Sequence, residues 1–386
     1  MSTSTVPGLL APGTYFMTGN FACVEAALMA GCRFYAGYPI TPSSEIFERA
    51  CTRFPQLGGQ AIEMEDEIGS MACLVGASYA GAKAMTATSG PGFSLMMENI
   101  GLAFIMEAPC VLVNVQRAGP STGIPTLVGQ GDMMQARWGS HGDLETIAYC
   151  PSSVQEFFEL TIRAFNTAER FRTPVFVMAD QVVGMMSERL VVPPLDSVEV
   201  VERQVADSKR AAELHEMPFD YSKDFLPMQI SGGGCRINVD SLTHDPKGYP
   251  STEHQVSQKM IDHLIGKIRN HASEIWKWEE TSLEDAEVAV VAYGSTARSA
   301  LSAVRKARAM GIKAGLLRLV TVWPFPDKVI ENLSGKVNSI IVPEVNYGQV
   351  VHSVREHSDC PVTGVNCAPG TLVDPRSILD ALELAA

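Results

Sequence analysis

Three loops, each following a short hydrophobic segment, are concentrated between Gly37 and Gly92. The first is Gly-Tyr-Pro-Ile-Thr-Pro-Ser-Ser at 37–44, the second is the acidic run Glu-Met-Glu-Asp-Glu at 63–67, and the third is Ser-Gly-Pro-Gly at 89–92. In an open parallel sheet, strand-to-helix loops gather at the carboxyl ends of the strands, where ligands bind. The stretch therefore predicts an α/β ligand-binding domain and places its site on these loops.

Hydrophobic strands and amphipathic or buried helices are predicted to alternate through the first half of the chain. Strands are expected at 32–38, 61–65, 83–89, 110–116 and 174–179, and helices at 21–30, 44–51, 66–80, 93–107 and 153–170. The glycine-rich segment 117–142 is expected to be a long loop, and loops of that length inside a domain are usually functional. The alternation is typical of a mainly parallel sheet with helices on both faces.

The length of 386 residues exceeds what one hydrophobic core usually supports, so two domains are expected. Because Pro193-Pro194 interrupts the pattern, we predict a first domain over 1–194, a linker with a long helix over 195–285, and a second α/β domain over 286–386. The expected elements of the later part are a helix at 253–281, strands at 286–293, 312–322, 337–343 and 361–366, and helices at 296–310 and 374–384. Residues 1–14 are expected to form a loose arm.

Composition excludes several classes of protein. A formal net charge of −13 argues against a nucleic acid as partner. No apolar run has the length of a membrane span, and the N-terminus lacks a basic segment followed by an apolar core, so a cytoplasmic protein is expected. The nine cysteines include no Cys-x-x-Cys pair, which indicates reduced thiols and no iron–sulfur cluster on this chain. The eight histidines show no metal-binding spacing, so no metal site is expected.

Glu67 begins a predicted helix that is rich in small residues. An acid in a first turn commonly does no more than complement the helix dipole. However, Gly69, Ser70, Ala72 and Gly76 would allow a flat ligand to approach this helix closely. A carboxyl group pressed into such a site would have a raised pKa and could hydrogen-bond a heterocycle. Both interpretations are open on these residues alone.

Three other features are chemical candidates. Arg117 ends a buried strand, where an arginine can bind a carboxylate with two hydrogen bonds, although a structural ion pair is an equal alternative. Gly90-Pro91-Gly92 lacks the lysine and the spacing of a phosphate-binding loop, so a tight turn is favoured. His141 could act as an acid or base, although a loop histidine without a chemical role is more common. The methionine-rich helix at 93–107 is expected to belong to the core.

Four segments taken together resemble the α subunit of 2-oxoacid:ferredoxin oxidoreductases. They are Gly-Tyr-Pro-Ile-Thr-Pro-Ser-Ser at 37–44, the helix of Glu67, Ser-Gly-Pro-Gly at 89–92, and Gln-Arg-Ala-Gly-Pro-Ser-Thr-Gly at 116–123. The continuation Ile-Pro-Thr and the later Gly-Gln-Gly-Asp at 129–132 are most similar to the 2-oxoglutarate type. The resemblance covers nearly the whole chain. It implies a thiamine diphosphate-binding fold, with a pyrimidine-binding domain followed by a transketolase C-terminal-like domain.

The resemblance also implies roles for individual residues. Glu67 matches the catalytic glutamate that hydrogen-bonds the aminopyrimidine ring of thiamine diphosphate. Thr41 and Arg117 match the residues that hold the carboxylate of the substrate. Further contacts with the cofactor are expected from Tyr38, Pro39, Ile40, Ser89 and Gly90. The implied reaction is the reversible oxidative decarboxylation of a 2-oxoacid with coenzyme A to acyl-CoA, CO2 and reduced ferredoxin, and the expected 2-oxoacid is 2-oxoglutarate.

Two departures from a complete enzyme of this family imply a partner. The Gly-Asp-Gly magnesium motif is missing, since Gly131-Asp132 is followed by Met133, and the cysteines of a cluster are missing too. In the family the β subunit carries the diphosphate and Mg2+ site and the [4Fe-4S] cluster, so this chain is expected to supply half of a site in an αβ or (αβ)2 assembly. Two alternatives stay open. One is the E1 β-type subunit of a 2-oxoacid dehydrogenase, an enzyme that passes its acyl group to lipoamide. The other is a non-catalytic scaffold subunit.

Overall fold

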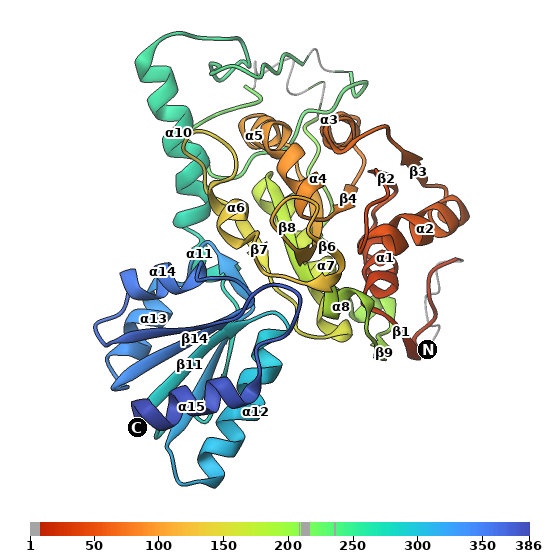
Figure 1. Cartoon of the computed structure of the whole chain (residues 1–386). Coiled ribbons are helices and arrows are strands. Elements are labelled where there is room, and N and C mark those ends of the chain that lie inside the picture. Colours follow the sequence, from red (N-terminus) through yellow and green to blue (C-terminus); the bar gives the residue numbers. More distant parts are fainter. Residues whose placement is uncertain (1–7, 208, 210–216, 235–236) are drawn as a thin grey trace.

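The computed structural model describes residues 8–207, 209, 217–234 and 237–386, and in this part of the chain two separate sheets are each covered by helices (Figure 1). The larger sheet has the order β13-β7-β8-β5-β4-β2-β3, with β6 paired to β5 outside this path. Its strands are β2 (Phe34–Gly37), β3 (Gln60–Glu63), β4 (Ala84–Thr88), β5 (Cys110–Ala118), β6 (Ile124–Val128), β7 (Ile147–Tyr149), β8 (Pro174–Asp180) and β13 (Thr321–Trp323). Neighbouring strands are parallel except at β6 and β13.

Helices cover both faces of the larger sheet because its central strand is apolar on both sides. In β5, Val111, Val113 and Val115 belong to one buried cluster, whereas Leu112 belongs to another. The first cluster includes side chains of α1 (Gly19–Met29), α2 (Ser44–Arg53) and α7 (Val154–Phe171), and the second includes α3 (Glu67–Tyr79), α4 (Gly90–Leu95) and α5 (Met97–Ile105). The predicted α/β class with helices on both faces is confirmed.

The smaller sheet has the order β10-β12-β11-β14-β15 and is parallel except at β10. Its strands are β10 (Trp278–Thr281), β11 (Val288–Tyr293), β12 (Ala314–Leu319), β14 (Ser339–Glu344) and β15 (Val362–Asn366). The helices α12 (Thr296–Ala309) and α15 (Pro375–Ala385) cover one face, and α13 (Asp327–Ser334) and α14 (Val350–Glu356) cover the other. The second face shares its buried cluster with α3, α4 and α5 of the larger region, so the two cores are continuous there.

The connection between the regions is fixed by a buried ion pair. It includes the short helix η2 (Leu195–Ser197), α10 (His254–Arg269) and α11 (Ala272–Ile275), and α10 runs along one side of the larger region toward the smaller sheet (Figure 1). Lys267 of α10 donates from Nζ to Glu107 Oε2 at 2.7 Å and to the Arg172 carbonyl at 3.2 Å, and it is almost fully buried. Lys267 lowers the pKa of the Glu107 carboxyl well below its usual range, although burial itself acts in the opposite direction.

Several predicted boundaries are wrong at positions where tertiary pairing decides the conformation. The expected loop at 117–142 contains β6 and α6 (Met133–Trp138), because β6 pairs with β5. The expected helix at 253–281 ends at Arg269, and its last residues form α11 and β10, because β10 pairs with β12. The single strand expected at 312–322 divides into β12 and β13, which join different sheets.

Two further corrections concern the N-terminal half. Gly90-Pro91-Gly92 is the first turn of α4 and not a tight turn, since a proline in a first helical turn loses no hydrogen bond. The helix expected at 93–107 is two helices that meet at Met96. Part of the expected arm is β1 (Gly13–Thr18), paired antiparallel with β9 (Ser187–Val192), while residues 1–7 lie outside the described residues.

The cysteine and membrane predictions can be compared with the described part of the chain. The eight cysteines described are free thiols, and Cys235 lies outside the described residues. Each helix that the structure describes is too short or too polar to span a bilayer.

The two sheets are joined through a network around Gln130 and Glu344. Gln130 Oε1 accepts hydrogen bonds from Thr296 Oγ1 at 2.9 Å and from the Val345 amide at 3.1 Å, and the Gln130 carbonyl accepts one from Asn346 Nδ2 at 2.8 Å. The fully buried carboxylate of Glu344 accepts hydrogen bonds from the amides at the start of α14, from Tyr293 and from Asn346. Glu344 therefore anchors α14 and the loop that reaches Gln130.

We expect Glu344→Gln to lower the free energy of unfolding by about 1.5–3 kcal/mol. The amide would replace one charged acceptor with a donor that faces other donors, and hydrogen bonds to charged groups contribute on that order. Chemical denaturation of the purified chain measures the change. The control is Glu356→Gln on the exposed face of the same helix, where a change within about 0.5 kcal/mol is expected. Equal denaturation midpoints for Glu344→Gln and Glu356→Gln would contradict the anchoring role of Glu344.

Candidate active site

Arg117 and Thr41 come together at the carboxyl ends of β5 and β2, the two strands that flank β4 in the larger sheet. Arg117 lies near the end of β5 and is 8% exposed, and its Nη1 donates to the backbone carbonyl of Thr41 at 2.7 Å. The carbonyl therefore orients the guanidinium, while the Thr41 hydroxyl is not its partner. Arg117 Nε is buried without a hydrogen-bond partner. Because buried donors are almost always satisfied in folded proteins, this nitrogen is suited to an external acceptor.

Glu67 is buried at the first position of α3, where Asp66 caps the helix. The Asp66 side chain accepts from the Gly69 amide at 2.7 Å, so Glu67 is not needed as a cap and its carboxyl is 5% exposed. Burial is the largest cause that raises the pKa of Glu67, and the nearby Asp66 adds to the increase. The backbone and Arg117 act in the opposite direction. The interpretation of Glu67 as a solvated first-turn acid is therefore wrong.

The loop after β4 lies against Glu67 because it has almost no side chains. A Cβ at Gly92 would overlap Glu67 Oε1 and Thr88 Oγ1, so Glu67 has room only because residue 92 is a glycine. Ser89 is fully buried, and its Oγ has no hydrogen-bond partner. Gly90 begins α4 and faces the carboxylate of Asp132. Ser89 and Gly90 thus lie at the carboxyl end of β4, and their contacts with a cofactor stay a prediction.

Asp132 and Asn114 belong to the same cluster but were not singled out as functional residues from the sequence. Asn114 Nδ2 donates to Asp132 Oδ2 at 3.0 Å, while Asn114 Oδ1 is buried without a partner. Burial raises the pKa of Asp132 to about 6, with the Asn114 hydrogen bond and Arg117 lowering it. Burial in turn lowers the pKa of Arg117. The available sequence signal was Gly129-Gln-Gly-Asp132, which was interpreted as a mark of the family resemblance and as an incomplete magnesium motif, with no role given to Asp132.

The remaining predicted residues line the same edge or lie apart from it. Tyr38 and Pro39 are exposed and Ile40 is half-buried, all in the loop that follows β2 and leads to Thr41. His141 is exposed in the loop after α6. The structure thus places Tyr38 to Thr41, Glu67, Ser89, Gly90 and Arg117 at or just after the carboxyl ends of strands of one sheet.

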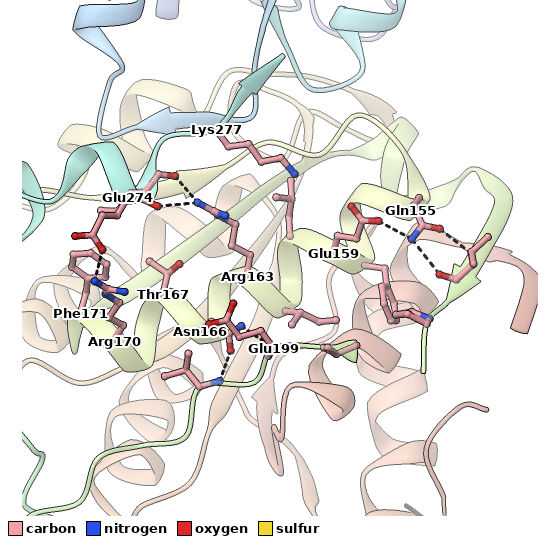
Figure 2. A pocket seen from close by; sticks show the side chains of 18 residues that line it. Gln155, Glu159, Arg163, Asn166, Thr167, Arg170, Phe171, Glu199, Glu274 and Lys277 are labelled. Atoms are coloured by element: carbon pink, nitrogen blue, oxygen red, sulfur yellow. Dashed lines mark hydrogen bonds and ion pairs between the residues drawn. The ribbon is translucent and has the colours of Figure 1, made fainter. Parts of the chain in front are cut away.

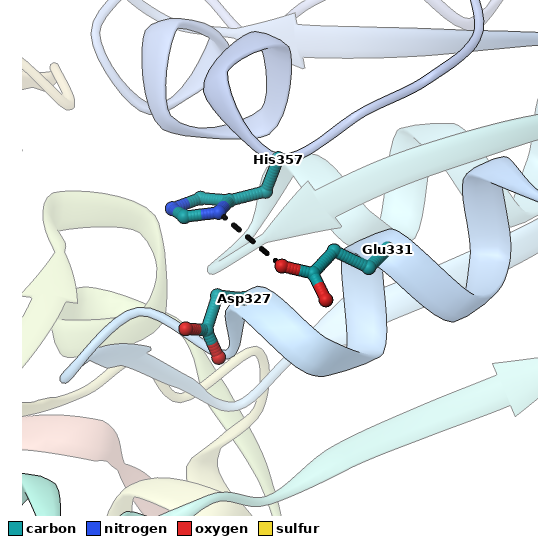
Figure 3. A group of neighbouring side chains, drawn as sticks. All are labelled: Asp327, Glu331 and His357. Carbon is teal, nitrogen blue, oxygen red and sulfur yellow. Dashed lines mark ion pairs between the residues drawn. The ribbon is translucent and has the colours of Figure 1, made fainter.

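A groove along α7 and a cluster of titratable side chains at α13 are two further features of the surface. A groove of about 760 Å³ runs along α7 and is lined also by residues of 193–201, and Figure 2 shows Arg163 in it, donating to the Glu274 carbonyl at 3.0 Å. In the described part of the chain, Asp327, Glu331 and His357 are close enough to hold a metal ion (Figure 3). Glu331 is already paired with Lys328 at 2.9 Å and the three side chains are half-buried, so this group is an ion-paired surface cluster.

Comparison with known proteins identifies the family of both regions. Residues 25–262 match the thiamine diphosphate-binding domain of pyruvate flavodoxin/ferredoxin oxidoreductases, and residues 286–378 match core domain II of pyruvate:ferredoxin oxidoreductase. The 2-oxoglutarate synthase subunit KorA of Methanocaldococcus jannaschii is 50% identical over 340 residues, which cover 88% of this chain and 90% of that protein.

Two solved structures resemble the whole fold. One is a 2-oxoglutarate:ferredoxin oxidoreductase from Magnetococcus marinus, with 2-oxoglutarate, coenzyme A and succinyl-CoA bound. It matches at a TM-score of 0.89 and 30% identity over 96% of this chain, which spans 65% of the length of the solved chain. A split-gene transketolase, described as an inactive β4 tetramer, matches at a TM-score of 0.54 and 13% identity over 95% of this chain and 96% of its own. The expected likeness to the transketolase fold is confirmed.

We expect Gly92→Ala to destabilise the chain by about 1–3 kcal/mol, because the added methyl group overlaps buried Glu67 and Thr88. The control is Gly76→Ala on α3, where an added Cβ meets no atom within 4 Å. Replacing a helical glycine by alanine in open space stabilises by roughly 0.5–1 kcal/mol. Thermal unfolding of both variants should thus give shifts of opposite sign. An unfolding midpoint for Gly92→Ala at or above that of the wild type would show that residue 92 is not closely packed against Glu67.

Proposed function

Because this chain belongs to the pyruvate flavodoxin/ferredoxin oxidoreductase family, we propose that it is the α subunit of a thiamine diphosphate-dependent 2-oxoglutarate:ferredoxin oxidoreductase. The complete enzyme would convert 2-oxoglutarate and coenzyme A to succinyl-CoA and CO2, and would pass two electrons to ferredoxin. The observation that carries the proposal is the convergence of Arg117 and buried Glu67 on strand-end loops of one sheet.

The residues of this site fit the pyrimidine half of thiamine diphosphate. The glycine at position 92 gives the Glu67 side chain room at this strand end, and Ser89 Oγ has no hydrogen-bond partner within the chain and could bind a group of the cofactor. Glu67 would hold the aminopyrimidine ring, and Tyr38, Pro39, Ile40, Ser89 and Gly90 would surround it. When bound, thiamine diphosphate supplies the carbon nucleophile and the electron sink for decarboxylation of a 2-oxoacid.

Glu67 acts by holding a proton next to a ring nitrogen. Its pKa is raised mainly by burial, so its carboxyl keeps a proton at higher pH than an exposed glutamate does. A protonated carboxyl can donate a hydrogen bond, which a carboxylate cannot do. The location of Glu67 at the start of α3, with Asp66 as the cap, keeps this carboxyl directed into the site.

Arg117 and Thr41 bind the carboxylate next to the keto group of the substrate. The Thr41 carbonyl occupies one nitrogen of the guanidinium and leaves Nε for an acceptor. A carboxylate bound at this partly dry position has its charge neutralised by a fixed cation, and the Thr41 hydroxyl is free to add a neutral hydrogen bond.

The partner that completes the site is proposed to be a β subunit in an αβ or (αβ)2 assembly. It would carry the diphosphate and Mg2+ site and a [4Fe-4S] cluster, and would meet ferredoxin. We assign the pyrimidine-binding role to residues 1–194 and the transketolase C-terminal-like role to 286–386, with 195–285 as the linker. We propose no nucleic acid and no membrane as a partner in this function.

We expect Arg117→Ala in the reconstituted α–β complex to lower kcat/KM for 2-oxoglutarate by about ten- to more than a hundredfold. The loss of a charge-assisted hydrogen bond costs roughly 1.5–3 kcal/mol. Thr41→Val removes one neutral hydroxyl and should cost less, roughly 0.5–1.5 kcal/mol. The measurement is steady-state reduction of viologen, with assembly checked by size-exclusion chromatography. An assembled Arg117→Ala complex with unchanged kcat/KM would rule out the carboxylate role.

Glu67→Gln should retain the KM for 2-oxoglutarate and lose roughly 100-fold or more in kcat, as is typical when a positioned acid–base group is removed. The matched control is Glu65→Gln, an exposed residue of the same acidic run that should leave both constants unchanged. The same assay with a lipoyl domain as acceptor tests transfer to lipoamide. Full turnover by the Glu67→Gln complex would instead favour a subunit without catalytic duties.

A further inference from the structure

The described residues at the site contain more acid than base. Glu67 and Asp132 both lie close enough to Arg117 to change its pKa, and Arg117 is the cation that they share. A 2-oxoacid adds at least one more carboxylate to the same guanidinium. Glu67 is proposed above to hold a proton already, so the carboxylates of Asp132 and of the substrate would share one cation. Burying two negative charges beside one positive charge is costly, and the charge balance therefore favours proton uptake by Asp132 when the substrate binds.

Asp132 occupies the N-cap position of α6 but does not cap the helix. An aspartate at this position usually accepts a hydrogen bond from an amide of the first turn. The Asp132 side chain makes no such bond, and the Met134 amide donates instead to Gln349 Oε1 at 2.9 Å. The carboxylate of Asp132 faces Asn114 and the Gly90 backbone. Gln349, in the loop before α14, thus binds the Met134 amide and leaves the Asp132 carboxylate in the site.

The Asn114 side chain provides an acceptor for a proton on Asp132. Asn114 Nδ2 already donates to Asp132 Oδ2, and Asn114 Oδ1, on the same amide, is buried without a partner. A neutral carboxyl is one donor with remaining acceptor capacity. Asn114 Oδ1 is therefore an unused acceptor on the side chain that contacts Asp132, and the ionised carboxylate has no proton to donate to it.

The groups around Asp132 allow its charge state to respond to the substrate. Strand β5 contributes Asn114 and the cation Arg117, α4 contributes the uncharged Gly90, and the loop before α14 contributes the neutral Gln349. Burial raises the pKa of Asp132 to about 6, and Arg117 lowers it. When a substrate carboxylate neutralises Arg117, this lowering is lost, so the pKa rises toward neutrality.

We propose that Asp132 takes up a proton from solvent when the carboxylate of a 2-oxoacid binds to Arg117, and that Asp132 is thereby a positioning residue that makes substrate affinity depend on pH. The inference rests on the proposed function for the presence of a 2-oxoacid at this site. The proton goes to the Asp132 carboxylate and returns to solvent when the site empties, so the step is balanced without another reactant.

The first test is the pH profile of kcat/KM in the α–β complex, which reports groups of the free enzyme. Protonated Asp132 favours binding, so kcat/KM should be highest below about pH 6 and should fall at least about fivefold between pH 6 and pH 8. Asp132→Asn keeps the shape and cannot ionise. It should abolish the decrease, match the wild type near pH 5.5 and exceed it at pH 8. The control is Asp143→Asn, at an exposed residue in the loop after α6, which should keep the wild-type slope.

The second test needs no turnover, and its decisive result comes from the wild-type complex. Calorimetric titration of 2-oxoglutarate into the cofactor-free α–β complex at pH 7, in two buffers with different ionisation enthalpies, measures the protons taken up. We expect about 0.5–1 proton per substrate for the wild type, by linkage of binding to protonation, and near zero for Asp132→Asn. Near-zero uptake by the wild type would overturn the proposal.

Two outcomes separate this proposal from the proposed function. If the wild-type complex oxidises another 2-oxoacid instead of 2-oxoglutarate, the proposed substrate is wrong, and both tests are made with that acid because it carries the same carboxylate. If Asp132→Asn retains the wild-type slope, or lowers kcat/KM equally at every pH, the effect of Asp132 is only structural and the proposal on proton uptake is overturned.

Discussion

The side chain of Gln130 holds the two halves of this molecule in register. Its oxygen accepts hydrogen bonds from Thr296 and the Val345 amide, and its nitrogen donates to Asp180 at 3.4 Å. Asp180 also accepts a hydrogen bond from the Ser295 amide at 2.8 Å. The starts of α8 (Gln181–Met185) and α12 therefore meet at one buried carboxylate. Because Gln130 lies two residues before Asp132, the smaller sheet controls the position of a loop in the site of the larger one.

Buried carboxyl groups in this chain have two kinds of role. Glu344 accepts several hydrogen bonds, and Glu107 is paired with Lys267, so both hold elements together. Burial of Glu67 and Asp132 raises their pKa values, and neither caps the helix at which it lies. Buried acids that have raised pKa values and lie at strand ends beside an arginine mark the part of the surface where chemistry is expected.

The sequence predicts the strands and loops of the site well because they depend on local patterns. Apolar runs bounded by glycine and proline place β2, β4, β5 and the residues that follow them within a few positions. Features that depend on distant partners were missed. The strand β6 needs its pairing with β5, β10 needs β12, and the proximity of Asp132 to Asn114 exists only after folding. The family resemblance supplied the roles of Thr41, Glu67 and Arg117, which composition alone left open.

The strand β13 has a consequence for how the protein is made. Thr321 and Trp323 pair with Tyr149 and Ala148, so a segment from late in the chain forms the edge strand of the sheet that begins at Phe34. Chains emerge from the ribosome in order, and their domains usually fold one after another as they appear. Here the first sheet has an uncovered edge at β7 until about four-fifths of the chain has been synthesised. The larger sheet is therefore completed only when the C-terminal half of the chain has been made. Truncation near residue 285 would leave the edge of β7 unpaired and open to pairing with another chain.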